Sequence, residues 1–188
     1  GKITVPIESI DYDDKRFGIE IQKITNKRAQ NAVVTGRIEG IIKMGKPDNP
    51  VFYNTLEDKL NELLALEKET QDNAEIIFDR LNGILTESQK EEQRRKELGL
   101  ENGFEFAVFG ELKKILDDEK VCVNSSVSIY EKISPLTDYV DWPDNLVVKK
   151  DMEKYIDEIL SGNNYPEDKI EELTEKIIDL AVRHLHER

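Results

Sequence analysis

Two histidines, His184 and His186, stand two residues apart near the end of the sequence, which contains no others. Imidazole nitrogens are common metal ligands, and a shared metal ion would need both side chains to point toward it. On a helix, however, residues at i and i+2 point in different directions. We therefore expect both to be exposed residues of a terminal helix, where a charged imidazole favours the helix C-terminus, and we expect no metal site.

A second pattern has the letters of a nuclease site in which two carboxylates hold Mg²⁺ and a lysine orients the attacking water. Pro47-Asp48 followed by Glu57-x-Lys59 matches those letters. The same acidic-x-Lys spacing recurs at residues 118–120 and 167–169, as expected in a chain so rich in Glu and Lys. Glu57 also falls in an expected helix, whereas the nuclease arrangement needs strands. The match therefore does not indicate a nuclease.

Cys122, Ser125 and Ser126 are the remaining candidate nucleophiles. A serine or cysteine nucleophile needs a positioned base, and no histidine lies nearby in the sequence. We interpret Cys122 as a small buried residue, and a single cysteine fits a reducing compartment, with the cytoplasm as the default. No phosphate-binding GxxxxGK[ST] loop is present. The residues therefore predict no catalytic group, bound cofactor or metal site in this chain.

Charge is distributed unevenly along the 188 residues, whose net charge is −13. Residues 1–50 carry nine Lys and Arg against seven Asp and Glu, so the rest is strongly acidic. An acidic bulk argues against the chain as a main nucleic-acid contact. We interpret the early cations as a solvated face or a partner contact, with DNA phosphate as the alternative. These candidates are Lys15, Arg16, Lys23, Lys27, Arg28, Arg37, Lys43 and Lys46.

Apolar spacing predicts a mainly α, bundle-like fold with a short extended N-terminal segment. No apolar run approaches the roughly 20 residues that a membrane-spanning helix needs, so we expect no membrane contact. We expect a single domain over residues 1–188. It should comprise an extended lead-in at 1–12, a first helical part at 13–116, an irregular connection at 117–145 and a helical hairpin at 146–186.

Several positions make these elements specific. A stripe of Phe17, Ile21 and Ile24 should continue through Ala29, Val33, Arg37 and Ile41 toward Met44. Thr86 and Gln89 have the spacing of a capping box that would open a polar helical arm. Trp142 should anchor the entry to the hairpin, with Asp144 or Asn145 as the cap and Pro166 in the first turn of the last helix.

Three stretches carry recognisable motifs in order. Residues 27–64 contain an Arg-Ala helix, an acidic-x-Pro turn and a Tyr-x-x-Leu-x-x-Lys-Leu helix; residues 96–112 contain Leu-Gly-Leu followed by Glu, Ala and an aromatic residue. Residues 138–181 contain Asp-Trp, a lysine-bearing helix and a Tyr-Pro-x-Asp-Lys turn. The matching residues are Arg28, Ala29, Asp48, Asn49, Pro50, Tyr53, Leu56, Lys59, Leu60, Leu98, Gly99, Leu100, Glu105, Ala107, Phe109, Asp141, Trp142, Lys149 or Lys150, Tyr165, Pro166, Glu167, Asp168 and Lys169.

Together these stretches resemble the C-terminal helical region of the restriction (R) subunit of type I restriction-modification enzymes. Many relatives have a Glu-His pair near the place of Val33-Val34, so no role of that histidine carries over. The resemblance implies a longer parent subunit that cleaves DNA and uses ATP and Mg²⁺ through upstream nuclease and helicase-like domains. Gly1 would then begin an excised domain and would be a tag remnant.

The resemblance also implies what this chain would do. It would be a non-catalytic module that docks the DNA translocase onto a methyltransferase core, with the methyltransferase (M) and specificity (S) subunits as partners and DNA reached through the complex. Tyr53, Trp142 and Pro166 would be structural anchors. The alternative is an accessory domain that contacts DNA through the basic first 50 residues.

Overall fold

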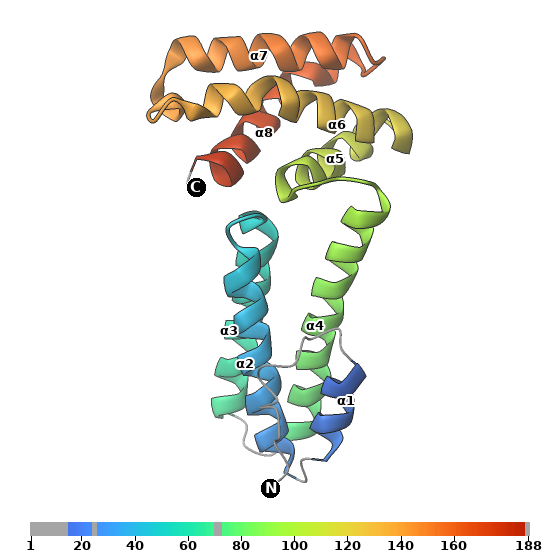
Figure 1. Ribbon diagram of the computed structural model, residues 1–188, viewed down its shortest axis with the longest axis vertical. Coiled ribbons are helices and arrows are strands. Elements are labelled where there is room, and N and C mark those ends of the chain that lie inside the picture. Colours follow the sequence, from blue (N-terminus) through green and yellow to red (C-terminus); the bar gives the residue numbers. More distant parts are fainter. Residues whose placement is uncertain (1–14, 24–25, 70–72, 187–188) are drawn as a thin grey trace, which may run out of the picture. The chain divides into compact units, whose positions relative to one another are not determined.

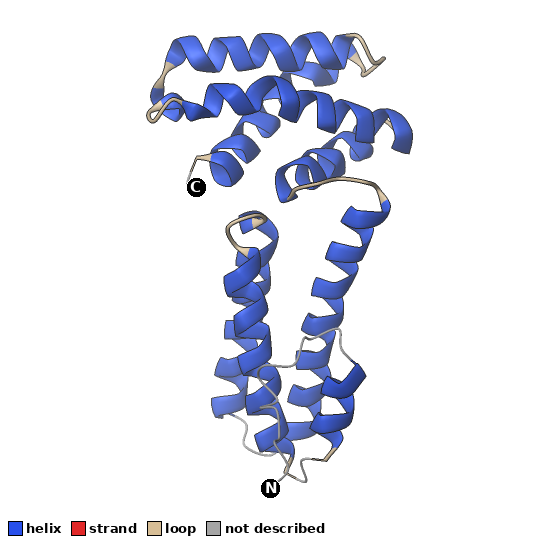
Figure 2. Ribbon diagram, in the orientation of Figure 1, coloured by secondary structure: helices blue, strands red, loops and turns tan. Residues whose placement is uncertain are grey.

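A computed structural model describes residues 15–23, 26–69 and 73–186. Over these ranges the chain forms eight α-helices and no strands, which confirms the prediction of a mainly α fold (Figures 1 and 2). The extended lead-in predicted at 1–12 lies outside them. The α-helices are α1 Lys15–Gln22, α2 Lys27–Gly45, α3 Pro50–Glu69, α4 Ala74–Glu97, α5 Gly103–Ile115, α6 Glu119–Ile133, α7 Leu146–Ser161 and α8 Glu167–Leu185.

The chain divides into two compact units, each described separately below. The first unit takes residues 1–46 and 52–93, and the second takes 47–51 and 94–188. The boundary after Gln93 falls inside α4. In the described ranges, no helix is long and apolar enough to cross a membrane. That the 188 residues behave as a single domain stays a prediction.

Apolar residues of α1 to α4 form the core of the first unit. The predicted stripe is wrong in α2, where Val34, Ile38 and Ile42 are buried in place of Val33, Arg37 and Ile41. Asn26 is the N-cap residue of α2, so α2 begins as a new helix after α1. The Asn26 side chain accepts hydrogen bonds from the first backbone N–H groups of α2. Adjacent apolar pairs at 33–34 and 41–42 make both stripes plausible from the sequence.

The predicted capping box at Thr86 is also wrong, because α4 continues without a break from Ala74 to Glu97. The Thr86 hydroxyl donates to the Asn82 carbonyl, one turn back in the same helix, at 2.9 Å. A threonine side chain inside a helix can make this bond without ending the helix. The polar arm and the apolar helix before it are therefore one element.

Helices α5 to α8 build the second unit, in which α5 packs on α6 and α8, and α7 packs on the same two helices. Residues 117–145, predicted to be irregular, contain the regular helix α6. Asp118 caps α6 by accepting from the backbone N–H of Val121 at 3.1 Å, and Pro135 stands in the short 3-10 helix η2 (Ser134–Asp138) that follows. Proline here marks the end of the helix and does not interrupt it.

Helices α7 and α8 pack against each other across the range predicted for a hairpin. Asn145, rather than Asp144, caps α7 by accepting from the first backbone N–H groups. Trp142 begins the 3-10 helix η3 (Trp142–Asp144) and is fully buried in the core of this unit. Pro166 directly precedes α8 as its N-cap residue, where its missing N–H costs no helical hydrogen bond.

Candidate functional site

The turn at residues 47–51 belongs to the second unit and closes over the start of α5. The Asp48 carboxylate accepts a hydrogen bond from the backbone N–H of Gly103 at 3.2 Å. A Cβ at position 103 would lie 2.5 Å from the Asp48 carbonyl oxygen, so only glycine fits there. The acidic-x-Pro motif therefore has a structural role, which is to pack the turn against the start of α5.

His184, on α8, lies against the same turn. Its Nδ1 is 3.4 Å from the Asp48 carbonyl oxygen, and its ring meets Phe104 edge to face. The expectation of an exposed His184 is wrong, since only 3% of the residue is exposed. Burial lowers the pKa of its imidazole, because the charged form loses hydration. A neutral ring that donates from Nδ1 satisfies the carbonyl. His186 is exposed, as expected.

Glu105 is a buried carboxylate at the start of α5, with 3% of the residue exposed. It accepts from the backbone N–H of Glu101 at 3.0 Å and from the Asn102 amide at 3.1 Å, while Asn102 accepts from the Glu105 N–H. Burial raises the pKa of Glu105. This reciprocal pattern is a helix cap of the capping-box type, so the carboxylate has a structural use.

The Leu-Gly-Leu motif before Glu105 ends α4. Gly99 has φ +74°, a left-handed conformation that favours glycine. The backbone N–H of Leu100 donates to the Arg95 carbonyl at 3.1 Å, and that of Gly99 donates to the Lys96 carbonyl at 3.0 Å. These two bonds form a Schellman motif, so the Leu-Gly-Leu stretch ends one helix shortly before the next begins.

A buried polar cluster joins α6 to the turn before α8. The Tyr165 hydroxyl lies 3.1 Å from Ser125 Oγ and 3.6 Å from Cys122 Sγ. Burial raises the pKa of both the Tyr165 phenol and the Cys122 thiol, so both stay protonated near neutral pH. A protonated, buried thiol is a poor nucleophile. Ser126 donates to the Cys122 carbonyl at 2.7 Å and adds to the structural role.

The residues that match the nuclease pattern have separate structural roles. Glu57 lies on α3, as expected, and pairs with Lys46 at 2.7 Å. Lys59 pairs with Glu87 at 2.7 Å, and the Asp48 carboxylate bonds to Gly103. Within residues 15–23, 26–69 and 73–186, no group of three His, Cys, Asp or Glu side chains is placed to hold a metal ion.

Several of the candidate cations already have partners within the first unit. Lys23 pairs with Glu20 at 2.9 Å, and Lys46 pairs with Glu57. The Lys27 ammonium lies 4.0 Å from the centre of the Phe78 ring, a cation–π contact.

The other candidate cations differ in exposure. Arg37 lies 5.8 Å from the centre of the Phe17 ring and is half-buried. Arg28 and Lys43 are exposed on α2. Lys15 and Arg16 belong to α1, but their side chains fall outside the described part of the chain. A phosphate-contacting role of the eight residues stays a prediction.

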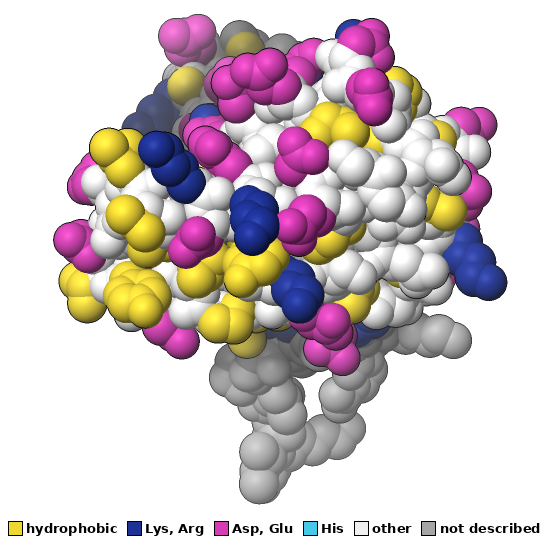
Figure 3. All heavy atoms as spheres, turned by 90° about the horizontal axis from the view of Figure 1, so that it is seen from above, with side chains coloured by type: hydrophobic (Ala, Val, Ile, Leu, Met, Phe, Trp, Pro, Cys, Tyr) yellow, Lys and Arg dark blue, Asp and Glu magenta, His cyan; other side chains and the backbone are white. Residues whose placement is uncertain are grey.

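A surface that sequence reasoning missed lies between α6 and α7. We define the apolar segment as Tyr139, Val140, Leu146 and Val147, which are 58%, 92%, 72% and 70% exposed, respectively. Hydrophobic side chains gather on the left of the face in Figure 3, the side on which the loop joining α6 to α7 lies in Figure 1. The sequence signal was the Leu-Val-Val run at 146–148, of which only Val148 turns inward.

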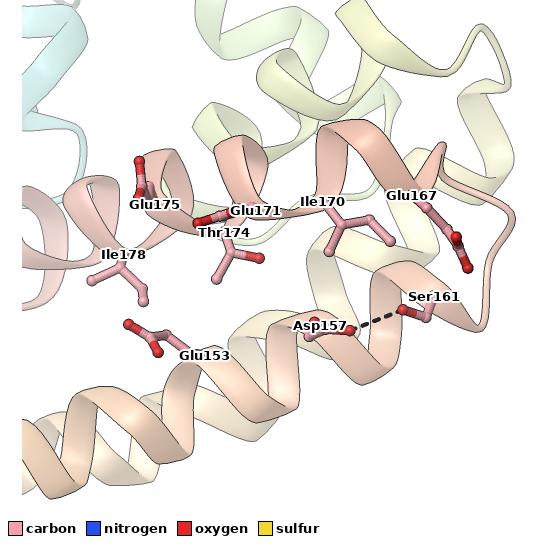
Figure 4. Close-up of a pocket in the computed structure, with 9 residues that line it drawn as sticks. All are labelled: Glu153, Asp157, Ser161, Glu167, Ile170, Glu171, Thr174, Glu175 and Ile178. Atoms are coloured by element: carbon pink, nitrogen blue, oxygen red, sulfur yellow. Dashed lines mark hydrogen bonds between the residues drawn. The ribbon is translucent and has the colours of Figure 1, made fainter.

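A groove between α7 and α8 is the second surface of interest, with a volume of about 490 Å³. Figure 4 shows side chains of both helices along it, with Thr174 and Ile178 on the side of α8 that faces α7. The groove is lined by Glu153, Asp157, Ser161, Glu167, Ile170, Glu171, Thr174, Glu175 and Ile178. We call it the acidic groove, because five of its nine residues are carboxylates.

Comparison with known proteins identifies the family. No curated protein and no solved structure matches the chain. A protein family described as "type I restriction enzyme HindI endonuclease subunit-like, C-terminal" matches residues 5–186, which span both units and nearly the whole sequence. The match agrees with the ordered motifs at residues 27–64, 96–112 and 138–181. The chain therefore belongs to the family of C-terminal domains of type I restriction enzyme endonuclease subunits.

Proposed function

We propose that this chain is a docking module, which joins the DNA translocase and endonuclease of a type I restriction enzyme to its methyltransferase core. The observation that carries the proposal is the apolar segment. Four large apolar side chains lie exposed within residues 139–147, two on the loop before α7 and two at the start of α7, and Trp142 of the same stretch is fully buried. Exposed apolar surface of this kind is typical of a protein contact.

The anchoring of this loop supports a preformed contact. Trp142 is packed in the core, the Trp142 carbonyl accepts from the Asn145 backbone N–H at 3.1 Å, and Asn145 caps α7. The apolar residues on either side are therefore held by a fixed backbone, which lowers the entropy lost on binding. A rigid apolar surface suits a lasting subunit contact.

The proposal assigns partners and chemistry to the whole enzyme. The methyltransferase and specificity subunits would be the binding partners, in the cytoplasm. DNA cleavage with ATP and Mg²⁺ would belong to domains outside these residues, and no step of that chemistry is assigned to this chain.

Binding of the chain to the cognate methyltransferase complex tests this proposal, for example by biolayer interferometry. Replacing Val140, Leu146 and Val147 by serine should weaken binding at least about tenfold, since a loss of about 1.4 kcal/mol suffices for that factor. The matched control replaces three exposed apolar residues elsewhere, Ile19, Met44 and Ile76, by serine. Wild-type affinity in the first variant, or no binding by the unaltered chain at micromolar concentration, would contradict docking.

The same samples distinguish the DNA-contacting alternative. A domain that follows DNA phosphate through Arg28 and Lys43 should retard duplex DNA, and this retardation should fall steeply as salt rises. A docking module of net charge −13 should show almost no retardation at any salt concentration.

A further inference from the structure

We propose that the acidic groove between α7 and α8 binds a lysine- or arginine-bearing peptide segment of a partner protein. This inference goes beyond the docking proposal, because it concerns a different surface with different chemistry and does not depend on the apolar segment. It is drawn from the charges, the buried hydroxyl and the apolar walls of the groove.

The carboxylates of the groove are not neutralised by the chain itself. Glu153, Asp157, Glu167, Glu171 and Glu175 form no ion pair with any described residue, and Asp157 only accepts a hydrogen bond from Ser161 at 2.9 Å. The neighbouring Glu172, by contrast, pairs with Lys176, and neither of these two residues lines the groove. Like charges gathered along one groove repel each other, and a cationic occupant would relieve that repulsion.

Thr174 gives an independent indication of a ligand. The residue is 7% exposed, and its hydroxyl oxygen is buried with no hydrogen-bond partner in the described structure. Figure 4 places Thr174 on the face of α8 turned toward α7, inside the groove. A buried hydroxyl without a partner is unfavourable, so a donor that enters the groove would satisfy it.

The walls decide what kind of cation fits. Ile170 and Ile178 stand one turn before and one turn after Thr174 on the same face of α8. An aliphatic stem can pack along these isoleucines while its ammonium or guanidinium group reaches the hydroxyl.

The number of inner acceptors favours a peptide over a free polyamine. Thr174 is the only described groove side chain that offers a buried, unpaired oxygen, while the carboxylates line the rim. One deep cation with further cations at the rim is what a peptide backbone running along the groove would present. A linear polyamine lying in the groove would place several charges at depth.

The test measures binding of a fluorescein-labelled octapeptide of alternating lysine and alanine to the 188-residue chain by fluorescence anisotropy. The groove variant carries Glu153→Gln, Asp157→Asn and Glu171→Gln. The control carries Glu131→Gln, Asp151→Asn and Glu158→Gln, exposed residues of α6 and α7 that do not line the groove, with the same change of net charge. The groove variant should bind about fivefold more weakly than the control, as expected for the loss of several partly screened ion pairs.

Thr174→Val supplies a second measurement, because valine keeps the shape and removes the hydroxyl. Its melting temperature should equal or exceed that of the wild type, and its affinity for the peptide should fall. Equal weakening by the groove and control variants would reduce the effect to net charge and overturn the proposal. Spermidine is the competitor in the same assay. If spermidine displaces the peptide and binds more tightly than the peptide does, the proposal is overturned in favour of a polyamine site.

Discussion

Truncation of Trp142 is the sharpest test of how the second unit is held together. The indole is fully buried in the core that α5 to α8 share, and the His186 ring meets it edge to face at 6.3 Å. A buried tryptophan removes on the order of 200 Å² from water, which at about 25 cal/mol per Å² stabilises the fold by about 5 kcal/mol.

The unpaired indole N–H of Trp142 lowers the net stabilisation that burial of the ring provides. The indole Nε1–H is buried without a hydrogen-bond partner among the described residues, and such a group costs about 1–3 kcal/mol. The Trp142→Ala variant loses this cost together with the packing, but it also leaves a cavity. We therefore expect a loss of about 3–5 kcal/mol in the free energy of unfolding. Trp142→Phe keeps a ring and removes the unpaired N–H, so it should lose less than about 2 kcal/mol.

Urea-induced unfolding followed by far-UV circular dichroism is the appropriate assay. Trp142 is the only tryptophan, so its fluorescence is lost in both variants but remains usable in the wild type as a reporter of the second unit. A loss below about 1 kcal/mol for Trp142→Ala would refute burial as the role of this residue. A loss above about 2 kcal/mol for Trp142→Phe would refute the cost assigned to the unpaired N–H.

Three further outcomes follow from the buried contacts. Burial lowers the pKa of His184 below its ordinary 6.5, so the unfolded state binds more protons than the folded state at acidic pH. The free energy of unfolding should therefore be highest above pH 6.5 and fall as the pH drops toward the folded pKa. His184→Leu should remove this pH dependence, whereas His186→Asn should leave it in place. Gly103→Ala should cost about 1–3 kcal/mol in urea titrations, whereas Gly110→Ala on the same helix, with open space around it, should stabilise by about 0.5–1 kcal/mol. Tyr165→Phe should cost about 0.5–1.5 kcal/mol by thermal unfolding, and an unchanged melting temperature would contradict its hydrogen bond to the serine.

Helices with a single unambiguous apolar stripe could be predicted from the sequence. The C-terminal pair α7 and α8 is the clearest case, because apolar residues recur at helical spacing and Gly162 and Pro166 mark the break. In α2 the stripe was displaced by one position, since neighbouring apolar pairs allow two faces. The burial of Asn31, whose amide donates to the Ala74 carbonyl at 3.0 Å, decides between them. Only the folded chain reveals that partner.

Distant partners also explain why helix α6 and the burial of His184 were not predicted from the sequence. The buried face of α6 includes Ser125 and Ser126, which look like exposed residues in a sequence pattern. Their burial depends on Tyr165, 40 residues away from Ser125, and on a bond back to the helix. His184 is covered by a carbonyl 136 residues earlier. Polar groups buried by distant partners carry no local periodicity, so their burial could not be predicted from the sequence.

The turn at residues 47–51 has a consequence for the evolution and engineering of this domain. It is assigned to the second unit, although the residues on both sides of it belong to the first. Neither unit is therefore a continuous stretch of the gene, and a single crossover after residue 93 would separate the second unit from its turn. A fragment that starts at residue 94 would lack Asp48, leaving the Gly103 N–H and the His184 ring without their partner. The second unit therefore needs a segment that the chain supplies from within the first, and the family match spans both units.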